Sequence, residues 1–161
     1  MLIALEGIAI CFIVLLVCVI AIADGPVGAV FFYEPEVQAR VVELGLTTKQ
    51  RIKRRKAIAG IALLLPMFVG VPVVVYAVNG ARGFLDIFVQ STAVMLIEGL
   101  FDRLFIDWWW VGRTRAWLIP GTEDLMPYVP RKTMVRKWIG TLIGYPLLAA
   151  LMAWVLCLCV G

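Results

Sequence analysis

The chain contains no histidine among its 161 residues, and only 16% of its residues are charged. Without an imidazole it cannot form a Ser-His catalytic triad or a His-ligated zinc or haem iron site. The scarcity of charge, together with 63% hydrophobic residues and a mean hydropathy of +0.97, indicates a membrane protein. This composition excludes a disordered chain, a disulfide-stapled secreted scaffold and a basic soluble nucleic-acid-binding protein. We therefore expect no nucleic acid partner.

Four apolar stretches are long enough to cross a bilayer, which takes about 20 residues of helix. The sequence predicts an all-α fold, an integral membrane four-helix bundle in a single domain 1–161, with spans at about 2–23, 57–78, 84–106 and 138–160. The first stretch ends in an Ala-x-Ala pattern like a signal cleavage site, but Glu6 stands where a signal peptide carries Lys or Arg. We therefore expect an uncleaved first helix.

The basic residues give the expected orientation. Of the 15 Lys and Arg residues, seven lie in the connection 24–56, six in the connection 107–137, and Arg103 lies at the adjoining end of the third span. Only Arg82 lies in the short second connection. Because Lys and Arg accumulate on the cytoplasmic side, the positive-inside rule places both long connections in the cytoplasm and both termini outside.

The first connection predicts a short amphipathic interfacial helix. Residues 34–44 begin with a proline suited to the first helical position, carry an apolar stripe of Val37, Val41 and Leu44, and end at Gly45. Thr47 and Gln50 match a capping box for a second helix that runs into the next span. The basic run at its start also suits anionic lipid headgroups, through Lys49, Arg51, Lys53, Arg54, Arg55 and Lys56.

Small residues and prolines mark the second and fourth spans. Gly60, Pro66, Gly70 and Pro72 predict kinks, and a kinked helix can line a cavity, although both residue types are common in membrane helices. The pattern Gly140-x-x-x-Gly144 predicts a close helix contact, either within the chain or between copies. The cysteines lie inside spans without metal-site spacing, so we expect packing residues: Cys11, Cys18, Cys157 and Cys159.

One face of the third span is polar. At 100° per residue, one side of this helix, a sector of about 160°, carries Asp86, Gln90, Ser91, Glu98 and Asp102. The opposite face is apolar and suits lipid or neighbouring helices, with Leu85, Val89, Ala93, Leu96 and Leu100. Because an ionised group is costly in a bilayer, we expect Glu98 to point into the bundle or toward another subunit.

The sequence does not determine which residues pair with the acidic side chains at and beyond Glu98. Arg103 can pair with Asp107 four residues on, and Arg113 or Arg115 is the nearest supply of cations for Glu98 and Asp102. Farther on, Pro120-Gly121 suits a type II turn, and Thr122 can cap a short helix that carries Glu123 and Asp124. If this loop folds under the bundle, the acids could gather into an oxygen-rich cation site, but the same arginines could neutralise them, and we expect no metal or cofactor.

These segments also carry a resemblance. The stretch from Phe101 to Trp110, the loop Pro120-Gly121-Thr122-Glu123-Asp124 and the stretch from Glu43 to Thr48 resemble a group of small bacterial multi-pass membrane proteins with this Gly-Thr-Glu-Asp loop after the third helix. The resemblance covers about a third of the chain. It implies a bacterial cytoplasmic membrane and carries over no catalytic role.

Three functions fit the sequence. The first is a non-enzymatic binding or transport component that uses the polar face of the third span, as a homodimer or with a partner membrane protein. The second is a membrane-embedded enzyme for a lipid or lipid-linked substrate, in which the acids act beside Arg113 and Arg115. The third is a structural accessory subunit whose acids only pair with arginines, without a pocket beside Glu98.

Overall fold

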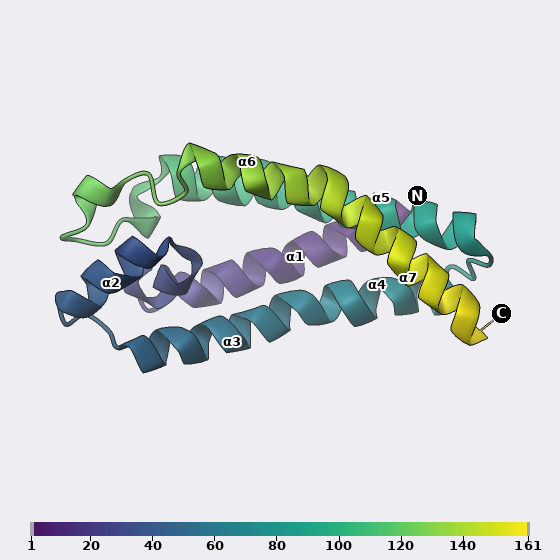
Figure 1. Ribbon diagram of the computed structural model, residues 1–161, viewed down its shortest axis with the longest axis horizontal. Helices are drawn as coiled ribbons and strands as arrows, with labels where there is room; N and C mark the ends of the chain where they lie inside the picture. The colour runs from purple at the N-terminus through teal and green to yellow at the C-terminus, as the bar shows by residue number, and fades with distance from the viewer. Residues whose placement is uncertain (1, 161) are drawn as a thin grey trace.

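The computed structural model describes residues 2–160. Its regular elements are all helices, and four of them are long and apolar enough to cross a membrane (Figure 1). These helices cover Leu2–Ile22, Lys49–Val78, Phe84–Val111 and Arg131–Cys159. Their segments are α1 (Leu2–Ile22), α3 (Lys49–Leu65), η2 (Pro66–Gly70), α4 (Val71–Val73), η3 (Val74–Val78), α5 (Phe84–Phe101), η4 (Asp102–Val111), α6 (Arg131–Ile139), η7 (Gly140–Gly144) and α7 (Tyr145–Val160). The connections hold η1 (Pro26–Phe32), α2 (Pro35–Glu43), η5 (Arg115–Trp117) and η6 (Glu123–Leu125).

The predicted four-helix fold is confirmed, but three helices extend beyond the predicted spans. The second begins at Lys49, the third continues to Val111, and the fourth begins at Arg131. Hydropathy marks the apolar part of a helix, whereas the hydrogen-bonded helix continues through polar residues at its ends. The predicted cap at Thr47 was wrong by one residue, because the Thr48 hydroxyl accepts a hydrogen bond from the Arg51 N–H at 3.2 Å.

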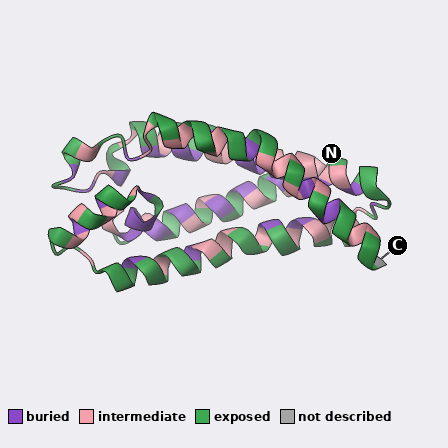
Figure 2. Cartoon of the chain, in the orientation of Figure 1, coloured by how far each residue is buried: buried purple, intermediate pink, exposed green. Residues whose placement is uncertain are grey.

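α5 is the central helix of the bundle. It packs against α1 on one side and α7 on the other, while α3 packs against α1 and η1 (Figure 1). Glycines allow both close contacts: a Cβ on Gly7 of α1 would lie 2.7 Å from Ile97, and one on Gly99 of α5 would lie 2.6 Å from Thr141. On the predicted apolar face of α5, Leu85, Val89 and Leu100 are exposed, and Ala93 and Leu96 are half-buried. Exposed positions occur along all the long helices (Figure 2).

The Gly140-x-x-x-Gly144 pattern does not form the close contact inside the chain. A Cβ on Gly140 or Gly144 would meet nothing within 4 Å. The buried small residues of this span are instead Ala149 and Ala153, which lie in the core with Met95 of α5. All four cysteines are free thiols. Cys11 and Cys18 are buried as expected for packing residues, whereas Cys157 is half-buried and Cys159 is exposed, so the expectation was wrong for Cys159.

The two long connections fold together into one cap at the end of the bundle opposite the two chain ends (Figure 1). Its core contains Tyr33, Val37 and Val41 from the first connection and Trp117 and Tyr128 from the second. The short helix between the first two spans is confirmed as α2, and Gly45 follows it with a φ of 70°. The stripe of α2 was expected at the membrane surface, but Val37 and Val41 pack inside the cap.

Side-chain hydrogen bonds fix the cap. The Tyr33 hydroxyl donates to the Trp117 carbonyl at 3.0 Å, and the Thr122 hydroxyl lies 2.6 Å from that of Tyr128. Burial raises the pKa of the Tyr33 hydroxyl well above its usual range, so this group remains a donor at physiological pH. Gly121 has a φ of 85°, and the Thr122 N–H donates to the Ile119 carbonyl at 3.2 Å, as the predicted turn requires.

The helix contacts generate a stability prediction. We expect Gly99→Ala to lower the free energy of unfolding by about 1–3 kcal/mol, because the added methyl overpacks the α5–α7 contact. Gly140→Ala is the matched control, since its methyl meets open space and alanine favours the helix. Unfolding of the purified protein in detergent checks both variants. An equal loss in the two, or none in Gly99→Ala, would contradict the close contact.

Candidate functional site

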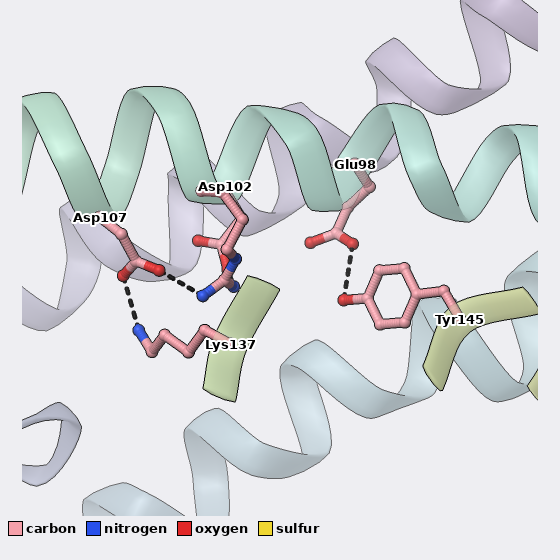
Figure 3. A network of polar contacts seen from close by, with 6 residues as sticks. Glu98, Asp102, Asp107, Lys137 and Tyr145 are labelled. Atoms are coloured by element: carbon pink, nitrogen blue, oxygen red, sulfur yellow. Dashed lines mark hydrogen bonds and ion pairs between the residues drawn. The ribbon is translucent and has the colours of Figure 1, made fainter. Parts of the chain in front are cut away.

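A network of four charged side chains lies where the third and fourth helices run side by side. The Arg103 guanidinium forms ion pairs with both Asp102 and Asp107. On the other side of Asp107, the Lys137 ammonium lies 2.6 Å from its carboxylate (Figure 3). The side chains of Arg103 and Asp107 are only 9% and 5% exposed. Two acids and two bases therefore balance their charges in a largely buried setting.

The local helix geometry explains how one arginine reaches both aspartates. In a regular α-helix, side chains five residues apart point about 140° away from each other. Residues 102–111 instead form a π-helical segment, whose hydrogen bonds join residues five apart and bring such side chains toward the same face. Asp102 and Asp107 are separated by five residues, so the wider turn places both beside Arg103.

Glu98 lies one turn before this network and is bound differently. It is 4% exposed, and the Tyr145 hydroxyl donates to its Oε2 at 3.1 Å. The two side chains point toward each other from α5 and α7 (Figure 3). Within residues 2–160, no lysine or arginine forms an ion pair with Glu98, and no hydrogen bond reaches its Oε1. Glu98 is thus a buried carboxyl with a neutral partner and one free oxygen.

A cavity of about 420 Å³ lies beside these groups, between α1, α3 and η2 on one side and α5, η4 and α7 on the other. Its polar lining comes from five side chains: Glu98, Asp102, Asp107, Lys137 and Tyr145. The remaining walls are apolar or aromatic, and the aromatic residues include Tyr33 of the cap. They also include the predicted kink region of the second span, where Met67 and Phe68 line the cavity. Trp117 and Val129 line it from the side of the cap.

The predicted polar face divides into two groups. Glu98 and Asp102 line the cavity, whereas Gln90 lies near the chain ends and accepts a hydrogen bond from the Asn79 amide at 2.9 Å. The same amide donates to Glu6 at 3.0 Å, and the Gln90 amide donates to Asp86 at 2.8 Å. Ser91 is fully buried, and among the described residues its hydroxyl has no hydrogen-bond partner.

The acids of the loop do not join the site. Asp124 pairs with Arg40 of α2 at 3.3 Å, and Glu123 accepts a hydrogen bond from the Gly121 N–H at 2.9 Å. Over residues 2–160 there is no group of three or more Asp, Glu or Cys side chains that could hold a metal ion. The expected short helix is present over Glu123–Leu125 with Thr122 at its N-cap position, but the Thr122 hydroxyl bonds to the Ile119 carbonyl and to Tyr128 instead of capping it.

The proposed cations for Glu98 and Asp102 were wrong as well. Arg113 lies over the Trp108 ring at 4.0 Å, and Arg115 is exposed. The predicted pair of Arg103 with Asp107 is confirmed, but Arg103 also takes Asp102, its immediate neighbour. In the basic run of α3, Arg55 pairs with Asp24 at 3.0 Å, and the others are exposed: Lys49, Arg51, Lys53, Arg54 and Lys56.

Sequence reasoning missed two members of the site, Lys137 and Tyr145. Lys137 directly precedes the predicted fourth span, so it counted only toward the orientation of the chain. A tyrosine well inside an apolar span is a possible signal, because a buried phenolic hydroxyl needs an acceptor. Nothing in the spacing identifies Glu98 as that acceptor, since the two residues are separated by 47 positions.

No protein-family model, curated protein or solved structure matches the chain. The function of this protein is therefore inferred from the geometry of the cavity and its charges.

The charge network predicts that Asp107 and Glu98 contribute differently to stability. We expect Asp107→Asn to lower the free energy of unfolding by about 3–5 kcal/mol, because it leaves Arg103 and Lys137 short of a buried negative charge. Glu98→Gln should leave stability unchanged or raise it, since no cation depends on Glu98. Thermal unfolding of both variants in the same detergent measures the difference. A destabilisation by Glu98→Gln as large as that by Asp107→Asn would contradict this assignment of charges.

Proposed function

We propose that this integral membrane protein is a non-enzymatic binding or transport component whose cavity holds a ligand dissolved in the membrane. The observation that carries the proposal is the buried Glu98 carboxyl, which faces a largely apolar cavity with one oxygen unbound. Ionisable side chains are costly inside a membrane and are typical of functional sites there.

The size and lining of the cavity support ligand binding. Its volume of about 420 Å³ lies in the range of small-molecule sites. Such sites combine apolar walls with a few polar groups that orient the ligand, which is the composition of this cavity. Four spans are few for a complete transporter, so transport would require a second copy or a partner membrane protein.

The contacts of the other acids argue against the two alternatives. A lipid-directed enzyme needs a free general base beside phosphate-binding arginines, but Asp102 and Asp107 are held in ion pairs, and Arg113 and Arg115 do not line the cavity. A purely structural subunit agrees with those ion pairs, yet it gives no reason for a cavity beside Glu98.

The proposal includes an orientation in a bacterial cytoplasmic membrane. The capped end of the bundle carries 14 of the 15 basic residues and would face the cytoplasm, with both chain ends outside. The exposed basic side chains at the start of α3 would then meet the anionic headgroups of the inner leaflet.

Ligand binding in the cavity is tested with a pair of matched substitutions on α1. Val14 lines the cavity, whereas Val19 of the same helix is 45% exposed toward the lipid side. We expect native mass spectrometry of the detergent-purified protein to find a noncovalently bound small molecule or lipid on the wild type and on Val19→Phe. Val14→Phe should lose most of it, because the added ring occupies the cavity.

Melting temperatures of the same samples show whether Val14→Phe is folded. A wild-type protein without any bound species, or equal occupancy in the two folded variants, would rule out ligand binding in this cavity.

The orientation is tested with single cysteines in a chain whose four native cysteines are replaced by alanine. We expect a membrane-impermeant maleimide to label Phe84→Cys, near the short second connection, in intact bacterial spheroplasts. Glu43→Cys, in the cap, should react only after lysis. Both wild-type side chains are exposed, so access depends on the side of the membrane. The reverse labelling pattern would contradict the proposed orientation and place the cap outside.

A further inference from the structure

The charge balance of the cavity identifies a class of ligand, and this step rests on the proposed function. We infer that the cavity takes an amphiphilic organic monocation, with its positive charge beside Glu98 and its hydrocarbon groups against the apolar walls.

Over residues 2–160, one carboxyl group of the cavity has no cationic partner. Arg103 and Lys137 neutralise Asp102 and Asp107, so Glu98 is the one carboxyl of the cavity without a cation in the described part of the chain. A carboxylate buried among apolar side chains is costly unless it is paired. A ligand with a single positive charge supplies the missing pair at the free Oε1.

The lining of the cavity is rich in aromatic side chains. Five aromatic side chains face the cavity, namely Phe32, Tyr33, Phe68, Trp117 and Tyr145. Tyr145 lies directly beside Glu98, with its hydroxyl 3.1 Å from the carboxylate. Aromatic faces attract cations with delocalised or alkylated charge, and their rings also pack against hydrocarbon groups. The same walls therefore suit both parts of an amphiphilic cation.

Other ligand classes fit less well. Calcium needs six to eight oxygen ligands and magnesium an octahedral set, whereas the carboxyls here are ion-paired except for Glu98 and form no group able to hold a metal over residues 2–160. An anion would face Glu98, and the Lys137 ammonium that could receive it already pairs with Asp107 at 2.6 Å. A neutral apolar molecule would leave the free Oε1 of Glu98 without a partner.

The test compares two probes of the same shape and opposite charge, tetraphenylphosphonium and tetraphenylborate. Equilibrium dialysis of the full-length protein in a non-ionic detergent, corrected with empty micelles, measures saturable binding of each. We expect tetraphenylphosphonium to bind the wild type, with tetraphenylborate binding at least about tenfold more weakly.

Variants locate the binding site of the cation. Glu98→Gln should lower the affinity for tetraphenylphosphonium at least about tenfold, by loss of a charge-assisted contact. Asp86→Asn neutralises a carboxylate on the same helix away from the cavity, so it should bind as the wild type does. Tyr145→Phe keeps the aromatic ring and removes only the hydroxyl, so a loss of about tenfold or more there would indicate that the hydroxyl rather than Glu98 holds the ligand.

The outcomes separate this inference from the proposed function. Equal binding of the two probes, or unchanged binding by Glu98→Gln, overturns the cation assignment, while loss of binding in Val14→Phe would still support a ligand cavity. The cation assignment is also overturned, and the ligand cavity supported, if native mass spectrometry finds a bound species that Val14→Phe loses while tetraphenylphosphonium does not bind. Binding of neither probe, together with no bound species, overturns both proposals.

Discussion

The bundle depends on one arginine placed between two aspartates. Arg103 pairs with Asp102 and Asp107, and Lys137 adds a second cation to Asp107 from the fourth helix. These charges allow a polar segment of the third helix to continue past the apolar span without leaving an unpaired ion in the bundle. They also join the third and fourth helices where no glycine contact holds them, so the position of the cap depends on the same network.

Glu98 stands outside this balance, and the contrast gives the cavity its chemical character. Asp102 and Asp107 are saturated by cations, whereas Glu98 is paired with the neutral Tyr145 hydroxyl at 3.1 Å. The apolar side chains that form most of the cavity wall provide little polar compensation for Glu98. Among the described residues that line this otherwise neutral and mostly apolar cavity, Glu98 is the one carboxyl without a cationic partner. It can therefore select among ligands, because its attraction for a ligand depends on the charge and the size of that ligand.

Hydropathy and residue periodicity were sufficient for the helices, for α2 and for the inward face of Glu98, because each is determined by local sequence. The Arg103–Asp107 pair also followed from a spacing of four residues. The partners of Glu98 and Asp102 could not be predicted in this way. Tyr145 is brought to Glu98 by the packing of two helices, and Asp102 reaches Arg103 in a π-helical segment that a regular helical wheel does not represent. The cap was missed because its core joins two connections that are far apart in the sequence, and the apolar stripe of the first was assigned to the membrane surface.

Because the cap joins two distant segments of the chain, it can fold only late in synthesis. The Tyr33 hydroxyl bonds to the carbonyl of Trp117, 84 residues later, and Glu34 accepts a hydrogen bond from Thr133, 99 residues later. The first connection therefore lacks these partners until synthesis has passed the third helix. The wall of the cavity on the side of the cap includes Trp117 and Val129, which follow the third helix. A chain that ends after its first two helices therefore lacks this wall.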